Sequence, residues 1–162
     1  MATYYMTRKG WEALVQRIDG LKRQLNVDIA GDLKTAAEHQ DFSENAEWDA
    51  ALEKQGLVKE EIRRLDERLA GAKLIDGLPL SDEKVTIGTR VSVYDLDAEK
   101  DLQYTILGEE DADVERLIIS YTSPLARGLI GKMEDEEVAI KVPAGIKNFL
   151  ITKIELANLD GP

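Results

Sequence analysis

The 162-residue sequence contains no cysteine and only one histidine, His39. A chain without cysteine forms neither disulfide bonds nor thiolate metal sites, which agrees with a reducing compartment. With a single histidine and no thiol, His/Cys zinc clusters and cysteine–histidine nucleophile pairs are also excluded. The phosphate-binding patterns G-x-x-x-x-G-K-[ST] and G-x-G-x-x-G do not occur either. Any chemistry of this chain must therefore come from carboxylates, and we interpret His39 as a solvated helix residue.

Long hydrophobic runs are also missing. No apolar stretch approaches the ~20 residues that a membrane span needs, and residues 1–10 lack the basic-then-apolar layout of a secretory signal. The composition, 43% hydrophobic and 33% charged, is that of a globular chain with room for one or two small domains. We expect a cytoplasmic protein without membrane contact.

Positive charge is scarce in the second half of the chain. The formal net charge is −11, of which residues 1–75 contribute −2 and the remainder −9. Binding of free nucleic acid normally draws on clustered lysine and arginine, so this surface favours a basic protein partner instead.

The first 37 residues contain the pattern of a long amphipathic helix. Thr7 is a suitable N-cap, and Met6 and Trp11 stand at the two positions of a hydrophobic staple. Apolar residues then step by three and four as in a coiled coil, but all steps become four after Leu25. Together with Gly31, this drift predicts a looser or bent stretch. The seam positions are Trp11, Leu14, Ile18, Leu21, Leu25, Ile29, Leu33 and Ala37.

A second helix resumes the full heptad. Gly71 and the run 76–79 supply stop signals, so we expect this helix to end near Lys73 to Ile75. The two helices predict an antiparallel coiled-coil hairpin about 45 Å long, which we expect to be monomeric and mostly solvated. On periodicity alone, a dimerisation or packing element remains the alternative. The seam positions, with both tryptophans expected in the core, are Trp48, Ala51, Gln55, Val58, Ile62, Leu65 and Leu69.

Beyond Pro79 the period changes to that of strands. Short β-branched or aromatic runs predict a small, mostly antiparallel β domain, and the segment 123–132 predicts one short helix capped by Ser123. The predicted class is therefore α+β, with a hairpin at 1–76, a linker at 77–80, the β domain at 81–156 and a frayed tail at 157–162. The predicted strands are 85–87, 90–94, 102–107, 117–121, 137–142 and 149–155.

Between the two predicted helices lies a short acidic segment, residues 41–48. One interpretation is structural: Asp41 at an N-cap with Glu44 three residues later is a capping-box arrangement. The other is functional, because carboxylate oxygens are the ligands that Mg²⁺ prefers, and one or two of them are typical of its sites. The pair alone could bind such an ion only weakly, so a site of this kind would be completed by another molecule.

Several motifs in order resemble a known family. Residues 41–48 are similar to the tip motif D-[LF]-x-E-N-A-E-[YW] of the bacterial transcript cleavage factors of the GreA/GreB family. Lys54-Gln55-Gly56 and the segment 123–132 match further elements, and the likeness runs over nearly the whole chain. The ending from Gly128 to Lys132 places it closer to the GreA branch.

This resemblance implies a mechanism. The hairpin would enter the secondary channel of RNA polymerase, where Asp41 and Glu44 would help hold a second catalytic Mg²⁺ and its attacking water beside a backtracked RNA 3′ end. Ser43 and Asn45 would be supporting neighbours that orient water or RNA. The polymerase, not this chain, would then be the enzyme that hydrolyses the RNA.

The resemblance also implies that the β domain is FKBP-like and docks on the polymerase at the channel rim. The implied contact residues are Pro124, Ala126, Arg127 and Leu129. No isomerase activity follows from the fold.

The chain departs from the family pattern in three places. Gln40 replaces the usual glycine before the tip aspartate, Ala37 and Leu52 replace basic residues, and the usual break in the first helix is missing around 26–29. These departures imply a weaker grip on RNA. Two alternatives therefore stay open: a non-catalytic regulator that binds the channel, and a coiled-coil adaptor whose acids only cap a helix.

Overall fold

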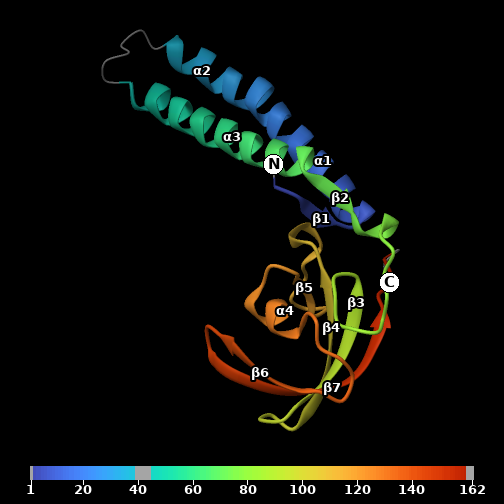
Figure 1. Cartoon of the computed structure of the whole chain (residues 1–162). Coiled ribbons are helices and arrows are strands. Elements are labelled where there is room, and N and C mark those ends of the chain that lie inside the picture. Colours follow the sequence, from blue (N-terminus) through green and yellow to red (C-terminus); the bar gives the residue numbers. More distant parts are fainter. Residues whose placement is uncertain (1, 39–44, 160–162) are drawn as a thin grey trace. The chain divides into compact units, whose positions relative to one another are not determined.

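The computed structural model describes residues 2–38 and 45–159 (Figure 1). The chain divides into two compact units. The first comprises Met1–Ala2 and Glu12–Gly71, and the second comprises Thr3–Trp11 and Ala72–Pro162. The described helices are all too polar or too short to form a bilayer-spanning segment.

The first arm of the hairpin consists of α1 (Arg8–Arg23), a π-helix (Gln24–Ile29) and α2 (Ala30–Ala37). Thr7 caps α1 as predicted, because its Oγ1 accepts the N–H of Gly10 at 3.0 Å. The predicted looser stretch is confirmed as the π-helix, which begins where the apolar steps change to four. The prediction of a core Trp11 is wrong: its side chain is 36% exposed.

The second arm is α3 (Ala46–Ala70), which lies beside α2 (Figure 1). Ile29 packs with Val58 and Ile62, and the half-buried residues Leu21, Leu25 and Leu33 surround this cluster. Arg17 pairs with Glu61, whereas Ile29, later in the first arm, packs with Val58, earlier in the second, so the two arms run antiparallel. The predicted antiparallel helical hairpin is thereby confirmed, although Ala36, not Ala37, is the buried residue near its end.

The predicted end of the second helix is wrong by a few residues. Helix α3 stops at Ala70, where the N–H of Gly71 bonds to the carbonyl of Glu67 at 3.1 Å. The chain then forms the strand β2 (Ala72–Leu74), which pairs in parallel with β1 (Tyr4–Met6). Neither three-residue strand was predicted, because each depends on a partner about 70 residues away.

Two carboxylates of the second unit, those of Asp111 and Asp76, accept hydrogen bonds from the start of α1. Asp111 Oδ2 accepts the N–H of Thr7 at 3.0 Å and that of Gly108 at 3.1 Å, and its Oδ1 accepts the Thr7 hydroxyl. Asp76 Oδ1 accepts the N–H of Arg8 at 2.8 Å. Negative groups at a helix N-terminus complement the unpaired N–H groups and the helix dipole, so both carboxylates stabilise the helix start.

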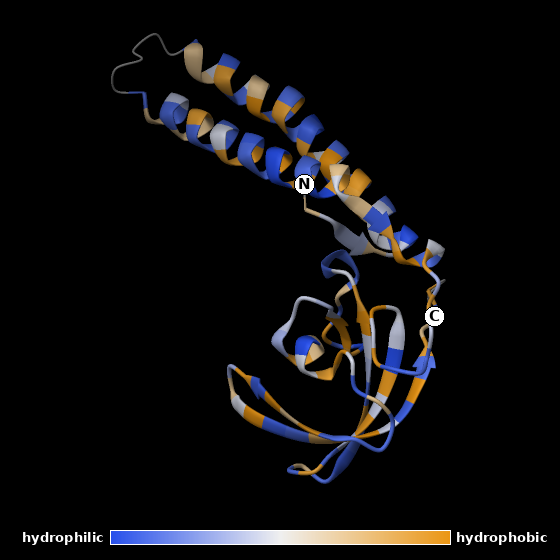
Figure 2. Ribbon diagram, in the orientation of Figure 1, coloured by the Kyte–Doolittle hydropathy of each residue, from blue (hydrophilic) through white to orange (hydrophobic). Residues whose placement is uncertain are grey.

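The second unit, or sheet unit, contains a five-stranded sheet in the order β5-β4-β3-β7-β6. All neighbours are antiparallel except β4 and β5. Hydrophobic and hydrophilic residues alternate along its strands (Figure 2), as expected of a sheet with one buried face. The strands are β3 (Thr89–Asp95), β4 (Lys100–Leu107), β5 (Ile118–Ser120), β6 (Glu137–Val142) and β7 (Gly145–Leu156).

Five of the six predicted strands are confirmed, and the prediction for 85–87 is wrong. Val85 is buried, but its backbone bonds to a loop: its N–H donates to Lys132 at 2.8 Å and its carbonyl accepts from Gly131 at 2.8 Å. These two bonds hold Val85 in a buried position outside the sheet.

One short helix, α4 (Pro124–Leu129), packs on the buried face of the sheet. Ser123 caps it, with the N–H of Ala126 donating to Ser123 Oγ at 3.2 Å, as predicted. The close approach of α4 to β6 requires a glycine, since a Cβ at Gly128 would stand 2.6 Å from Ile140 Cγ2. The core that α4 completes contains Val85, Val91, Val93, Ile106, Ala126, Leu129, Val138, Ile140, Phe149, Ile151 and Ile154.

Candidate functional site

The acidic segment connects the two arms of the hairpin. Helix α2 ends at Ala37 and helix α3 begins at Ala46, so residues 41–45 of the segment fall between the two helices and residues 46–48 belong to the first turn of α3. Asp41, Ser43 and Glu44 lie outside the described residues, and so do Gln40 and His39. What the structure does describe is the pair of helix ends from which the segment extends.

Asn45 ties these two helix ends together. Its Nδ2 donates to the carbonyl of Ala36 at 2.7 Å, and its Oδ1 accepts the N–H of Trp48 at 3.0 Å. The residue is 8% exposed, and its bond to Ala36 is buried while its bond from Trp48 is partly buried. Asn45 therefore caps α3 and bonds the end of α2 with one side chain, directly beside Glu44.

The predicted capping box on α3 is wrong, because Asn45 holds the N-cap and Trp48, not Glu44, is the third residue after it. Asparagine is as good an N-cap as aspartate, so Asn45 directly before the periodic run was the signal that could have located the cap. The resemblance predicted that Asn45 orients water or RNA, and that role stays a prediction. Its described bonds are both to the backbone of the hairpin.

The described surroundings of the segment carry charge of both signs. Glu47 and Asp49 lie in the first turn of α3, where they complement the positive end of the helix dipole. A hollow of about 370 Å³ lies between α2 and α3 and includes Asp32 and Lys54 in its lining. Leu52, which replaces a basic residue of the family pattern, is 41% exposed, and Ala37 is half-buried.

No group of three potential metal ligands occurs within residues 2–38 and 45–159. The donor set of Asp41 and Glu44 fits Mg²⁺ in kind, because both side chains offer hard carboxylate oxygens. Two carboxylates leave most of an octahedral coordination shell to other ligands. The chemistry of these donors therefore fits a shared metal site rather than one completed by this chain.

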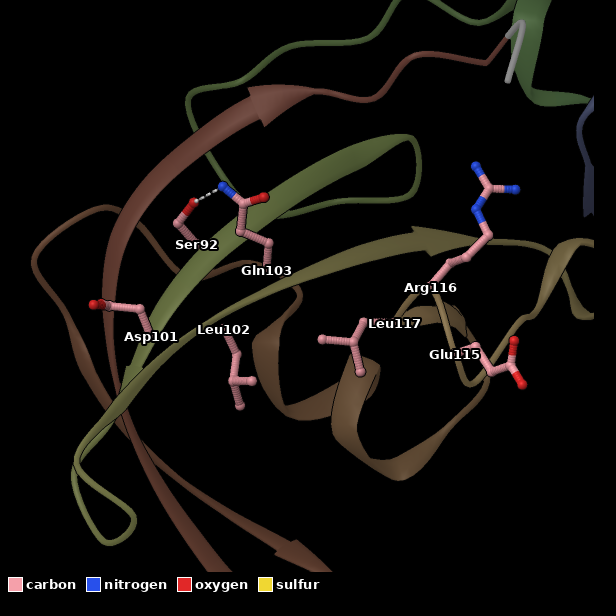
Figure 3. A pocket seen from close by; sticks show the side chains of 7 residues that line it. All are labelled: Ser92, Asp101, Leu102, Gln103, Glu115, Arg116 and Leu117. Atoms are coloured by element: carbon pink, nitrogen blue, oxygen red, sulfur yellow. Dashed lines mark hydrogen bonds between the residues drawn. The ribbon is translucent and has the colours of Figure 1, made fainter. Parts of the chain in front are cut away.

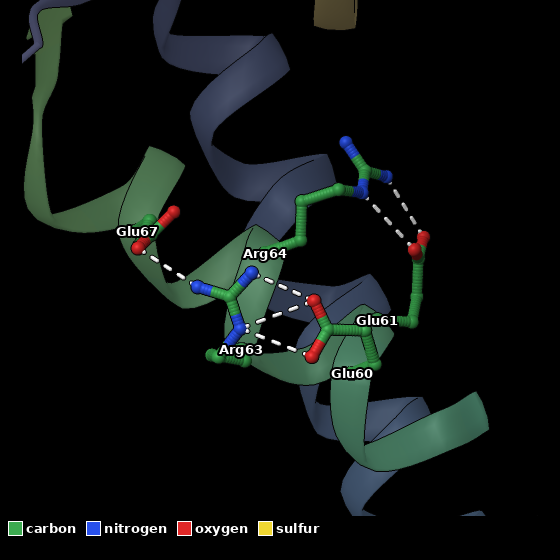
Figure 4. A network of polar contacts seen from close by, with 5 residues as sticks. All are labelled: Glu60, Glu61, Arg63, Arg64 and Glu67. Atoms are coloured by element: carbon green, nitrogen blue, oxygen red, sulfur yellow. Dashed lines mark hydrogen bonds and ion pairs between the residues drawn. The ribbon is translucent and has the colours of Figure 1, made fainter. Parts of the chain in front are cut away.

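Further down the hairpin, charged side chains form a network on the surface of α3 (Figure 4). Arg63 pairs with Glu60 at 2.7 Å and with Glu67 at 2.9 Å, at helical spacings of three and four residues. Glu61 accepts from Arg64 at 2.9 Å and from Arg17 of the other arm at 3.3 Å.

These pairs shift the pKa values of the exposed network. The hydrogen bond from Arg63 lowers the pKa of Glu60, and those from Arg64 and then Arg17 lower the pKa of Glu61. The pKa of Arg63 is raised, first by its hydrogen bond to Glu60. Exposed pairs of this kind add little stability each. We therefore interpret the network as the solvated face of the hairpin, in which Glu61 links the two arms.

The second predicted contact region lies on α4, and the structure divides its four residues into two pairs. Ala126 and Leu129 are fully buried in the core of the sheet unit, so they present no side-chain surface to a partner. In this structure their apolar side chains hold α4 on the sheet, and a contact of these two residues with the polymerase stays a prediction. Pro124 and Arg127 are exposed, and their contact role stays a prediction.

Two family models match the chain in succession. Residues 4–74 match the model described as "Transcription elongation factor, N-terminal", and residues 80–156 match "Transcription elongation factor, GreA/GreB, C-term". Curated relatives match nearly end to end. A protein named "Transcription elongation factor GreA" from Phenylobacterium zucineum is 39% identical over 150 residues, which cover 93% of this chain and 96% of that protein. The protein of the same name from Hyphomonas neptunium is 41% identical over 149 residues, covering 92% and 95%.

Among solved structures, the chain is similar to the "GreA factor homolog 1 (Gfh1) protein of Thermus thermophilus". The identity is 21%, the TM-score is 0.43, and the match covers 95% of this chain and 99% of that one. A likeness at this level carries no argument about function.

Proposed function

The chain belongs to the GreA/GreB family of transcription elongation factors, and from this premise we propose that it acts on bacterial RNA polymerase by stimulating cleavage of backtracked RNA. In this proposal the helical hairpin enters the secondary channel and carries Asp41 and Glu44 to the RNA 3′ end. The polymerase's own active site performs the hydrolysis, so this chain is a factor and not itself an enzyme.

The observation that carries the proposal is the bonding of Asn45. Because Asn45 caps α3 and bonds Ala36, the N-cap of that helix is neither Asp41 nor Glu44. The capping-box explanation of the pair therefore does not apply at the N-cap of α3. This supports a role of the two carboxylates toward a partner.

Asp41 and Glu44 would hold Mg²⁺ jointly with the polymerase, and the bound ion would supply Lewis-acid stabilisation of charge on the phosphate oxygens. The two carboxylates would also accept hydrogen bonds from a water and so orient it. Asn45 would act as a positioning residue, because it fixes the helix end from which the acid pair extends. The exposed residues Pro124 and Arg127 would contribute to docking at the channel rim.

The proposal is tested by the double substitution Asp41→Asn with Glu44→Gln, which removes both charges and keeps side chains of similar size. The assay is RNA cleavage in reconstituted, backtracked elongation complexes with Mg²⁺ present. We expect a loss of stimulated cleavage on the order of 100-fold, corresponding to about 3 kcal/mol of transition-state stabilisation. Binding to polymerase, measured by competition with the parent protein, should be unchanged.

A matched control removes two carboxylates elsewhere on the hairpin. Glu12→Gln with Asp19→Asn has the same charge change on exposed residues of α1 and should retain full cleavage. If the tip variant binds and cleaves like its parent, the metal role is wrong. If the parent slows RNA synthesis without promoting cleavage, the chain is a channel-binding regulator instead, and failure to bind polymerase would favour a coiled-coil adaptor.

A further inference from the structure

Strand β4 extends beyond its neighbour at one end. It contains eight residues, Lys100–Leu107, but β5 pairs only with the last three, Thr105–Leu107. Along the remainder of that edge, no strand in the described part of the chain covers β4. This overhang is a short open sheet edge.

The backbone groups that point outward from the overhang follow from the bonds beside it. The N–H of Thr105 donates to Leu117 at 3.0 Å, and the carbonyl of Leu107 accepts from Tyr121 at 2.8 Å, so odd-numbered residues of β4 face away from β3. The carbonyl of Ile106 accepts from Gly88, on the side of β3. By this alternation, the N–H and C=O groups of Asp101 and Gln103 point out from the open edge.

The turn before β5 keeps this edge open. Leu117 has a φ of +55°, in the left-handed region that disfavours side chains with a Cβ. Its carbonyl bonds Thr105, and the chain before it turns back, with Asp113 Oδ1 accepting the N–H of Glu115 at 3.1 Å. Strand β5 therefore pairs with β4 only from Thr105 onward, and the edge of β4 before Thr105 has no strand beside it.

A hollow of about 630 Å³ lies at this edge and reaches both faces of the sheet (Figure 3). On one side it is lined by Ser92 and Gln103, whose side chains bond each other at 3.3 Å. On the other side it is lined by the half-buried Leu102 and Leu117. An extended chain laid along β4 would thus meet polar groups on one face and apolar groups on the other.

The charges at the two ends of the hollow differ in sign. Asp101 lies at one end and Arg116 at the other (Figure 3), and no carboxylate among the described residues forms a salt bridge with the Arg116 guanidinium. The carboxylate of the adjacent Glu115 points away from the Arg116 guanidinium in Figure 3. A second hollow of about 290 Å³ shares Gln103 and Arg116, and no carboxylate lines it.

We propose that the β4 overhang binds an extended segment of a partner protein by strand addition. The segment carries an acidic residue facing Arg116, a basic residue facing Asp101, and an apolar residue between them that faces Leu102 and Leu117. Alternate side chains of a strand point to the same face, so an acidic and a basic residue two positions apart share one face, about 6.7 Å from each other, while the apolar residue between them faces the other. Main-chain bonds to Asp101 and Gln103 supply affinity, and the side chains supply selectivity. The proposal does not depend on the role of the hairpin.

The test uses the full chain and synthetic peptides. The probes are the seven-residue peptides Thr-Val-Glu-Val-Lys-Val-Thr and Thr-Val-Lys-Val-Glu-Val-Thr, which present the charge pair in the two possible strand directions. Amide NMR of the labelled protein should show saturable binding of at least one peptide below about 1 mM. The shifts should centre on Asp101, Gln103 and residues 115–118, and the amides of Asp101 and Gln103 should gain protection from solvent exchange.

Two substitutions separate the main-chain bonds from the charges. Gln103→Pro removes an outward N–H at an edge position that tolerates proline, and should weaken binding about fivefold or more, whereas Gln103→Ala retains that N–H and should weaken it less. Arg116→Glu should weaken binding several-fold, while Lys141→Glu, the same charge change on the other edge strand β6, should not. Retained amide spectra of each variant show that it is folded.

The proposal is overturned if neither peptide binds, if shifts centre on another strand, or if peptides N-methylated at alternate amides in either register bind as well as the parent peptide. It is also overturned if a peptide with glutamine in place of both charged residues binds equally tightly. Shifts of Asp101 and Gln103 that depend on protein concentration without peptide would instead assign this edge to pairing between two copies of the chain.

Discussion

Asn45 contributes two separable hydrogen bonds, and substitutions there can measure both. Asn45→Ala removes the cap on Trp48 and the bond to Ala36, whereas Asn45→Asp keeps an oxygen for the cap but replaces the Nδ2 donor with a carboxylate oxygen that faces the Ala36 carbonyl. An N-cap of this type contributes about 1 kcal/mol, and a typical intramolecular hydrogen bond also contributes about 1 kcal/mol. We therefore expect destabilisation of the connected helix ends by about 2 kcal/mol in Asn45→Ala. In Asn45→Asp the cap is kept, and the loss, about 1–3 kcal/mol because two acceptors face each other, falls on the end of α2.

Hydrogen exchange is the suitable assay, because the two units need not unfold together and local opening is what the substitutions change. The amide of Trp48 should exchange roughly 30-fold faster in Asn45→Ala, since each 1.4 kcal/mol is a factor of ten. In Asn45→Asp the same amide should remain protected by the cap, while amides at the end of α2 exchange faster. Amides of the sheet, such as that of Val93, are the internal control and should not change.

The reasoning is refuted if both variants protect Trp48 as well as the parent does. It also fails if Asn45→Asp loosens Trp48 as much as Asn45→Ala does, because the cap would then not be the source of protection. If cleavage activity falls in Asn45→Ala in proportion to the fraction of opened helix ends, the residue acts through positioning. Restoration of activity in Asn45→Asp would then single out the cap.

Two further predictions concern the sheet unit. Gly10→Ala should destabilise the protein by about 1–3 kcal/mol in urea unfolding, because its Cβ would overlap Asp111 Oδ1 and lie 3.1 Å from Asp111 Cγ. As a control, Gly20→Ala, whose Cβ would have nothing within 4 Å, should stabilise the same helix by about 0.5–1 kcal/mol. Equal effects of the two substitutions would contradict the packing argument. Asp95 is buried and accepts the N–H groups of Ala98 and Asp97, each at 2.9 Å, and these bonds lower its pKa, the one from Ala98 most. A lowered carboxyl pKa stabilises the fold above the unfolded pKa of about 4 and loses that effect as the pH falls through the folded value. The unfolding free energy of the parent should therefore drop more steeply below pH 4 than that of Asp95→Asn. Coincident slopes for the two proteins would show that these bonds do not favour the charged form.

Local sequence patterns predicted the elements whose stabilising contacts are themselves local. Thr7 and Ser123 cap the helices that were assigned to them, because an N-cap bonds an N–H only three residues away. Strand β6 has the predicted bounds, 137–142, since its residues alternate cleanly between buried and exposed. The drift of the apolar steps after Leu25 marked the π-helix.

The features that the sequence did not predict depend on distant partners. The short strands β1 and β2 exist through each other, and Val85 is buried by bonds to the loop after α4. Ala126 and Leu129 matched a family motif, but a motif does not distinguish residues that hold a helix in place from residues that contact a partner. At the acidic segment, the motif identified Asp41 and Glu44, whereas only the bonds of Asn45 showed which residue caps α3.

The parallel pairing of β1 with β2 has a consequence for how the chain folds. Every residue of the hairpin lies between these two strands in the sequence, so their register can form only after the whole hairpin has been synthesised. Closing a flexible loop of that length would cost roughly 4 kcal/mol in chain entropy. If the hairpin forms first, through helices that contact each other along their lengths, the chain between β1 and β2 is already ordered. Most of this entropy cost is then met before the two strands pair. We therefore expect the helical hairpin to be the early folding step, with the attachment of β1 to the sheet unit following it.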